Sequence, residues 1–182
     1  MPYTFLLPKG NYRSLLAFQK AECIYDVTYY FTHKYLEKGD RTIDQMVQAA
    51  RSGRQNIAEG CSAATTSLET EIKLLNVARA SLQELLLDYE DYLRVRNLSL
   101  WPVDSEKAKQ TRKVCFKNND SAFYRQKIVE RSAETIANIA ITLIHQCDVM
   151  LRRYIDYLQD HFLKTGGIRE QMFKARRKYR GF

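Results

Sequence analysis

The sequence predicts an all-α protein, an antiparallel up-down-up-down four-helix bundle with an extended fourth helix and a basic C-terminal tail helix. Two observations support this fold class. Apolar residues recur at three- and four-residue steps through long segments, which is the spacing of one buried helix face. Three prolines and seven glycines in 182 residues leave few positions where a helix must stop. Long helices joined mostly by short connections pack as antiparallel neighbours, so we expect no strand of any length.

The chain divides into three predicted regions. Residues 1–11 form an N-terminal extension, residues 12–165 form the bundle and residues 166–182 form the basic tail. Within the bundle, residues 98–120 are a basic connector between the third and fourth helices. A chain of this length is long enough to bury a core of its own.

The first two helices are expected at the start of the bundle. The first covers about residues 12–38, and Gly39 follows it at a position that favours left-handed backbone. The second is expected to begin near Thr42, with Asp40 or Thr42 as its N-cap, and to end at Gly60.

The third helix has the clearest pattern, a stripe of apolar residues, mostly leucines, from Leu68 to Leu93. Thr66 or Ser67 is expected to cap its start, and the helix is expected to end near Asn97.

The connector and the fourth helix follow. Pro102 disfavours helical geometry just before it, and residues 104–116 are expected to form a short surface helix. The fourth helix is predicted as one long element over residues 121–164. Gly166 and Gly167 are expected to end it, and a basic amphipathic segment covers residues 168–180.

The sequence lacks the features of a membrane or secreted protein. No apolar run approaches the roughly 20 residues that a membrane span needs, and the first residues have neither a basic start nor a small-residue cleavage site. We therefore expect a cytoplasmic protein with no membrane partner.

The four cysteines, Cys23, Cys61, Cys115 and Cys147, lie far apart and form no C-x-x-C pair. In a reducing compartment this spacing favours small buried apolar side chains over metal ligands or a disulfide.

The net charge of +8 is confined to two segments. The tail from Gly167 to Phe182 contains six cations and one acid, and the stretch from Asp104 to Lys117 contains five cations and two acids. These segments carry +5 and +3, which leaves the rest of the chain neutral. The basic charge therefore belongs to the connector and the tail rather than to the predicted bundle.

The sequence lacks the motifs of the catalytic and metal-binding sites that we considered. A di-iron helical bundle needs Glu-x-x-His motifs, but His33, His145 and His161 follow Tyr30, Thr142 and Leu158 at that spacing. No phosphate-binding glycine loop and no G-x-S-x-G nucleophile motif occurs. We therefore predict a protein that is not an enzyme, with no catalytic residue, no metal site and no cofactor.

The polar residues Asn56 and Glu59, beside the apolar Ile57, allow two interpretations. As a functional site they would contact RNA or a protein partner. As structural residues they would bond backbone groups at a helix end, and the carboxylate would pair with a nearby arginine. We favour the structural interpretation. The candidate partners are Arg51, Arg54 and Arg79.

These residues also carry a resemblance. "NIAEG" at 56–60, followed by "LETEIKLLNVARASLQELLLDY", is similar to the signature of the four-helix-bundle family of 23S rRNA intervening-sequence proteins. An A-x-x-S-x-x-E-L element of that family matches Ala78, Ser81, Glu84 and Leu85. The resemblance covers residues 12–98 well and the fourth helix loosely. The segment from Asn138 to Arg180 is similar to a suffix region found on longer members. The structural motif residues are Asn56, Glu59, Gly60, Ser81 and Glu84.

The resemblance implies an up-down-up-down bundle that self-associates and has no reported catalysis. The family includes the accessory variability determinant of diversity-generating retroelements, a basic five-membered ring that binds reverse transcriptase and nucleic acid. By resemblance, the expected partners are further copies in a ring with five-fold symmetry, RNA or DNA, and a protein such as a reverse transcriptase.

Two functional hypotheses remain open. In the first, an oligomeric accessory protein binds RNA or DNA through basic residues interleaved with Phe173, Tyr179 and Phe182. In the second, the bundle is an assembly module that recruits a protein partner and has no nucleic-acid role. The two are compatible, because a ring would multiply a weak tail contact. The candidate nucleic-acid-binding residues are Lys174, Arg176, Arg177, Lys178 and Arg180, with Arg112 and Lys113 secondary.

Overall fold

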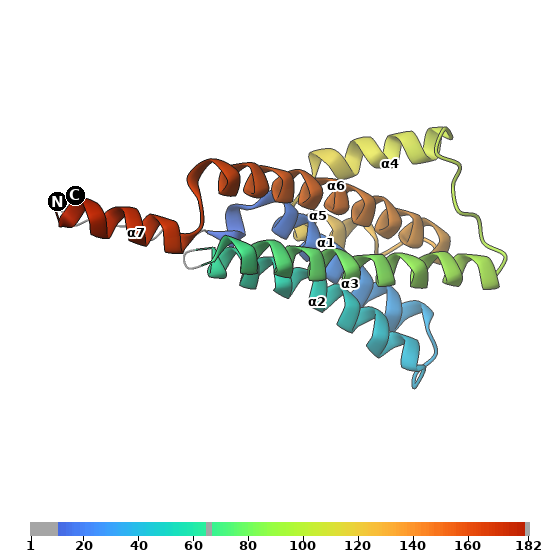
Figure 1. Cartoon of the computed structure of the whole chain (residues 1–182). Coiled ribbons are helices and arrows are strands. Elements are labelled where there is room, and N and C mark those ends of the chain that lie inside the picture. The colour runs from blue at the N-terminus through green and yellow to red at the C-terminus, as the bar shows by residue number, and fades with distance from the viewer. Residues whose placement is uncertain (1–10, 65–66, 181–182) are drawn as a thin grey trace.

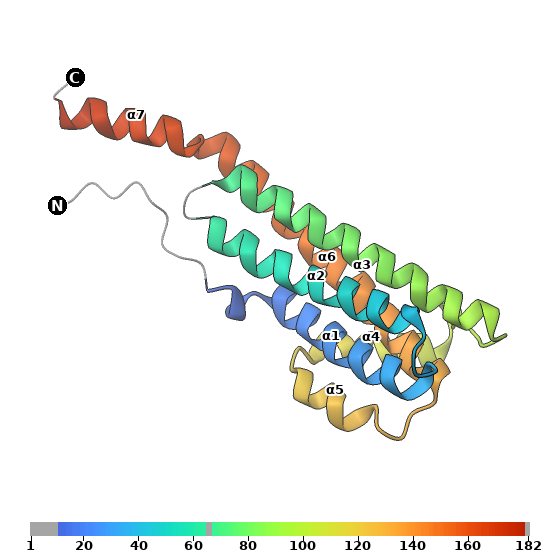
Figure 2. The ribbon, with the colours of Figure 1, turned by 90° about the horizontal axis from the view of Figure 1, so that it is seen from below.

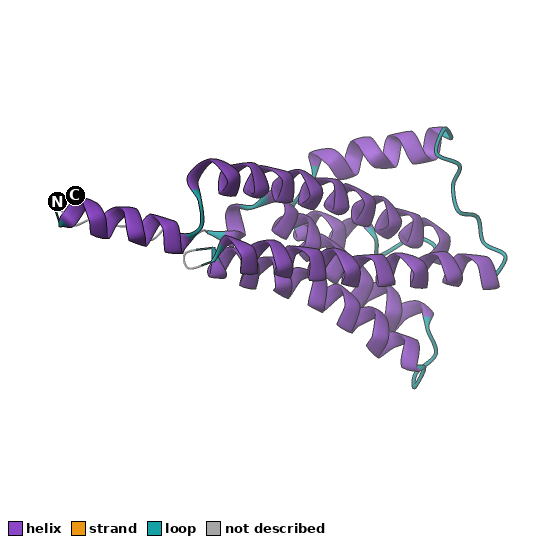
Figure 3. Ribbon diagram, in the orientation of Figure 1, coloured by secondary structure: helices purple, strands orange, loops and turns teal. Residues whose placement is uncertain are grey.

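The computed structural model describes residues 11–64 and 67–180. The predicted all-α class is confirmed, because these residues form helices and loops and no strand (Figure 3). The elements in chain order are the 3₁₀ helix η1 (Tyr12–Ser14), α1 (Leu16–Tyr35), α2 (Arg41–Ala63), α3 (Leu68–Val95), α4 (Glu106–Lys117), α5 (Ser121–Lys127), α6 (Ala133–Thr165) and α7 (Ile168–Tyr179).

The four longest helices share one core. Helix α2 packs between α1 and α3, and α6 packs against both α3 and α1, an arrangement that can be followed in Figures 1 and 2. Phe31, Leu82 and Leu143 lie among the fully buried apolar side chains between them. The buried hydroxyl of Tyr89 donates a hydrogen bond to Thr28 Oγ1 at 3.0 Å, so this polar group is satisfied inside the core.

The expected helix starts and stops are mostly confirmed. Asp40 caps α2 by accepting a hydrogen bond from the backbone N–H of Thr42, and Gly39 has a positive φ of 95°. Ser67 caps α3, whereas Thr66, the other expected cap, lies outside the described residues. The predicted first helix is shorter than expected, because η1 and an extended residue precede α1. Residues 1–10 of the expected N-terminal extension also lie outside the described part.

The prediction that Gly60 ends the second helix is wrong. Helix α2 continues to Ala63, and Gly60 is buried within it. A Cβ atom at Gly60 would lie 3.3 Å from the main-chain oxygen of Glu71, and one at Gly53 would lie 2.7 Å from Leu82 Cδ2. Both glycines therefore serve close packing of α2 on α3.

The prediction of one long helix over residues 121–164 is also wrong. The chain forms α5 and α6 with a break between them, and Ser132 caps α6. The Tyr30 hydroxyl and the Lys34 ammonium of α1 both donate to the main-chain oxygen of Val129, at 2.8 and 2.7 Å. These side chains satisfy a carbonyl that a continuous helix would use internally. The apolar spacing misled the prediction because Ile128, inside the break, is still buried in the core.

Candidate cationic binding surfaces

Helix α7 presents the basic tail. The chain turns at Gly166, whose φ is +76° and whose N–H donates to the Phe162 oxygen at 2.8 Å. Helix α7 then extends past the ends of the packed helices, as Figures 1 and 2 show from two sides. It buries none of its residues. All five tail residues of the nucleic-acid hypothesis are exposed on it: Lys174, Arg176, Arg177, Lys178 and Arg180.

Apolar side chains accompany these cations. Phe173 is 64% exposed and Tyr179 is 79% exposed on α7, and Leu163 at the end of α6 is 82% exposed. Phe182, the third aromatic residue of the hypothesis, lies outside the described residues. One face of α7 is half-buried at Ile168, Gln171 and Ala175. The exposed aromatic side chains give it a surface suited to stacking bases or packing on another protein.

Helix α4 presents the second group of cations. Side chains of α1 and α6 hold it in place by donating hydrogen bonds to main-chain oxygens in or next to this helix. The fully buried Lys20 of α1 donates from Nζ to the main-chain oxygens of Cys115 and of Asn118, the latter at 3.1 Å. Gln146 Nε2 of α6 donates to the Arg112 oxygen at 3.0 Å. Burial lowers the pKa of Lys20 from its ordinary value. A buried cation near the last carbonyls of α4 also suits the negative end of that helix.

Two cationic side chains of α4 are available to other molecules. Lys113 is exposed, Arg112 is half-buried, and neither forms an ion pair within the described part of the chain. Lys109 pairs with Glu106 at 3.1 Å. Figures 1 and 2 show α4 and α7 at distant parts of the molecule, so a single chain does not bring the two candidate cationic groups together.

The motif residues link α2 to α3. Asn56 Nδ2 donates to the Ser52 main-chain oxygen at 2.9 Å and contacts its hydroxyl at 3.1 Å. The Ser52 hydroxyl shares a hydrogen bond with the Ser81 hydroxyl at 2.9 Å. Ser52 was missed from sequence, although it lies one helical turn before Asn56. Glu84, by contrast, is exposed.

The arginine partner expected for Glu59 does not occur. Glu59 is exposed and forms no ion pair with a described residue. Arg54 instead lies over the ring of Tyr25, 4.4 Å from its centroid, and Arg79 pairs with Asp148 of α6 at 2.8 Å. An exposed carboxylate needs no partner, so the physical reason for the prediction does not apply at this position.

The buried carboxylate is Glu71, which sequence reasoning missed. Its Oε1 accepts a hydrogen bond from the Tyr154 hydroxyl at 2.8 Å, and Oε2 has no partner among the described residues. Burial raises the pKa of Glu71. The signal was present, because Glu71 lies between Leu68 and Leu75 at the three- and four-residue spacing of the buried stripe.

All four cysteines are buried, as predicted, and none is in a disulfide. Burial raises the pKa of Cys147 to about 12, which keeps this thiol protonated and unreactive at neutral pH. Within residues 11–64 and 67–180, no three His, Cys, Asp or Glu side chains are grouped so that they would hold a metal ion. No helix in that part of the chain combines the length and apolar character needed to cross a membrane.

Comparison of the chain with protein-family models, with curated proteins and with solved structures found no match.

Proposed function

We propose that this protein is a non-enzymatic, oligomeric helical-bundle accessory protein that binds RNA or DNA through α7. The observation that carries the proposal is that α7 buries none of its residues while presenting cations and aromatic rings together. Cations on such a helix neutralise phosphates and release counterions, and exposed aromatic side chains stack on bases without reading their sequence. Arg112 and Lys113 on α4 are the secondary contacts.

We further propose that α1, α2, α3 and α6 form an up-down-up-down four-helix bundle of the 23S rRNA intervening-sequence family. The closed order of contacts among these helices supports the bundle, and short connections after α1 and α2 favour antiparallel neighbours. The Asn56–Ser52–Ser81 link supports a structural role for the two family-like motifs.

Self-association is the proposed means of gaining affinity. A ring of copies, five-fold by the family resemblance, would present several α7 helices to one nucleic acid and convert weak contacts into an avid one. A reverse transcriptase is the proposed protein partner, by the same resemblance. A cytoplasmic location follows as part of this proposal.

The test compares full-length protein with protein truncated after Gly166, using fluorescence anisotropy with single-stranded RNA and duplex DNA. We expect truncation to remove most of the affinity for both. The full-length protein should bind more weakly as salt rises, with a log–log slope near 0.7 to 0.9 per phosphate neutralised. Full affinity in a folded truncated protein would refute the proposal.

A matched pair of variants separates α7 from overall charge. Arg176→Gln with Arg177→Gln lowers the net charge by two on α7, and Arg51→Gln with Lys127→Gln lowers it equally on exposed positions elsewhere. We expect the α7 pair to weaken binding several-fold more than the control pair. Equal losses would indicate attraction by net charge alone.

The assembly hypothesis remains a second candidate, because one observation favours it. Leu163 and Phe173 are large apolar residues left in water on adjoining helices. Light scattering of the full-length and truncated proteins tests it. Loss of oligomeric mass together with unchanged nucleic-acid affinity would favour the assembly module that recruits a protein partner.

A further inference from the structure

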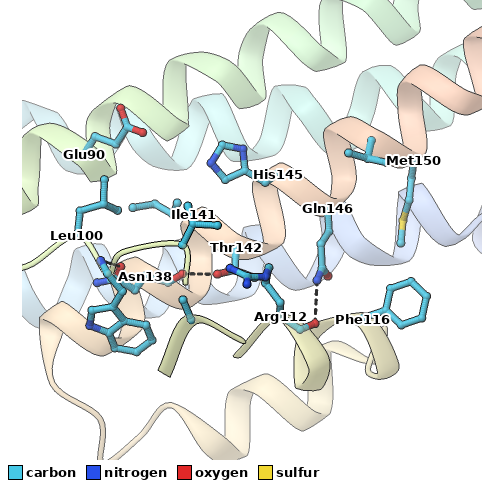
Figure 4. Close-up of a pocket in the computed structure, with 14 residues that line it drawn as sticks. Glu90, Leu100, Arg112, Phe116, Asn138, Ile141, Thr142, His145, Gln146 and Met150 are labelled. Carbon is cyan, nitrogen blue, oxygen red and sulfur yellow. Dashed lines mark hydrogen bonds between the residues drawn. The ribbon is translucent and has the colours of Figure 1, made fainter. Parts of the chain in front are cut away.

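A groove lies between α4 and α6, on the side of the molecule away from α7. Its volume is about 380 Å³, which is within the range of about 300–1,000 Å³ typical of small-molecule sites. Figure 4 shows the residues that line it, which come mainly from α4, α6 and the connector before α4. Its apolar wall includes Leu100, Trp101, Ile141, Val149 and Met150.

The wall remains in contact with water. Leu100 is 51% exposed, and Val149 is also exposed. Trp101 is held in place, because its ring Nε1 donates to Glu134 at 3.1 Å and its backbone N–H donates to Asn138 at 2.9 Å. Rigid walls that are already in position lower the ordering cost of binding a ligand.

Arg112 gives the groove a cationic end. Its main-chain oxygen is occupied by Gln146, but its guanidinium has no hydrogen bond or ion pair with any residue the structure describes. Figure 4 shows this side chain directed from α4 toward α6, between Thr142 and Gln146. The acid in the lining is Glu90, which the figure shows on the Leu100 side, away from Arg112.

A neighbouring hollow adds to the positive field. Arg112 and Lys113 line that hollow, as do Lys109 and Glu106, which pair with each other at 3.1 Å and leave the positive field to the first two residues. An anion is therefore attracted to the Arg112 end, whereas an apolar chain is attracted to the wall that runs toward Trp101.

We propose that this groove binds a free small-molecule monocarboxylate with an apolar chain. The carboxylate pairs with the Arg112 guanidinium, whose planar fork matches two carboxylate oxygens. The chain lies along Ile141, Val149 and Trp101. This site is separate from α7 and goes beyond the proposed nucleic-acid function.

The experiment uses intrinsic fluorescence, because Trp101 is the only tryptophan in the chain. Full-length protein is titrated with decanoate and, in parallel, with decyltrimethylammonium, each below its micelle concentration. The two probes share an apolar chain and differ in the sign of the head group. We expect a saturable change in Trp101 emission with decanoate and at least tenfold weaker binding of the cation. Equal affinities, or no saturation by decanoate, would overturn the proposal.

Variants localise the carboxylate. Arg112→Gln should weaken decanoate binding by about tenfold or more, the loss expected for one charge-assisted contact. Lys117→Gln removes an equal charge from the exposed end of α4, outside the groove, and should leave the affinity within about twofold. Calorimetric titration gives the same comparison without relying on Trp101, and circular dichroism checks that each variant is folded. An Arg112→Gln protein that is folded and binds decanoate normally would refute the site.

A second variant and a second probe exclude other sources of the signal. Val149→Asp places an acid on the apolar wall and should abolish decanoate binding. Vesicles of anionic phospholipid, which present anionic head groups on apolar chains at a membrane surface, should neither change Trp101 emission nor compete with decanoate. Vesicle binding that depends on Arg112, without decanoate binding, would overturn the assignment to a free molecule.

Discussion

Helices α4 and α7 have the same length of 12 residues and a similar excess of cations, yet only α4 packs buried side chains against the rest of the protein. Helix α4 buries Ala108 and Cys115 and gives its last carbonyls to the buried Lys20. Helix α7 buries nothing. Charge content therefore does not decide whether a basic segment packs against the core. The deciding factor is whether the core supplies partners for its main chain and apolar side chains.

The same contrast applies to two buried ionisable groups, Lys20 of α1 and Glu71 of α3. Lys20, which holds α4, has two carbonyl partners for its ammonium group. Glu71, which contacts the part of α6 that leads to α7, has one oxygen bonded to Tyr154 and the other without a described partner. Removing the first charge should therefore destabilise the protein, whereas removing the second should stabilise it.

The largest expected effect is that of Lys20→Met. This change leaves the Cys115 carbonyl without its buried donor, whereas the half-buried Asn118 carbonyl keeps the Tyr124 hydroxyl as a donor at 2.9 Å. We expect a loss of about 2 kcal/mol in the free energy of unfolding. Urea denaturation measures the loss, and hydrogen exchange should show reduced protection in α4. The control is Lys73→Met, which removes a fully exposed pair with Glu69 and should cost far less, because water and salt screen such pairs. If α4 kept its protection in the Lys20 variant, the comparison with α7 would fail.

Glu71→Gln should act in the opposite direction. Burial raises the pKa of Glu71 above its ordinary value of 4.5, so the native state holds this proton more tightly than the unfolded state does. The proton-linked stability is fully present below the unfolded pKa and is lost as pH rises through the folded pKa. Glutamine removes the charge and keeps an oxygen for Tyr154, so we expect the free energy of unfolding at pH 7 to increase.

The pH dependence distinguishes this cause from a general packing effect. Thermal unfolding of both proteins from pH 4.5 to 7.5 should show the advantage of Glu71→Gln growing as pH rises. An advantage that is constant with pH, or a loss at pH 7, would contradict the assignment of Glu71 as a buried, incompletely bonded carboxylate.

A smaller effect is expected where α2 and α3 meet. Ser81→Ala removes the hydroxyl that bonds to Ser52 in a half-buried contact, which should lower the free energy of unfolding by about 1 kcal/mol. Glu59→Ala, one turn from Asn56 but exposed and unpaired, should change it by about 0.5 kcal/mol or less. Chemical denaturation of the two variants side by side checks the ranking. The reverse order would restore the structural role first predicted for Glu59.

Features that depend on local sequence signals were predicted correctly, whereas features that depend on distant residues were missed. Helical periodicity predicted the all-α class, and cap chemistry located Asp40, Ser67 and Gly166 because those signals are local. The break between α5 and α6 was missed because it depends on Tyr30 and Lys34, which lie about 100 residues earlier in the chain. The role of Gly60 was missed for a similar reason, since the neighbouring Glu71 backbone decides it.

The candidate surfaces were also predicted only in part. The charge count identified α4 and α7 directly from the residues. It did not reveal that Arg112 borders an apolar groove, because the opposite wall comes from α6. Lys20 gave no sequence signal as a site, because a lysine on an apolar face is usually read as one that extends its ammonium to water.

The smallest expected effect on stability is that of removing α7. Truncation after Gly166 deletes a helix that buries no residue, so little apolar surface is exposed by its loss. We expect the free energy of unfolding of the monomeric unit to change by about 0.5 kcal/mol or less, measured by urea denaturation at low protein concentration. A loss of several kcal/mol would mean that Ile168, Met172 and Phe173 cover the exposed end of α6 in solution. The tail would then belong to the core, as α4 does, and its cations would be incidental to function.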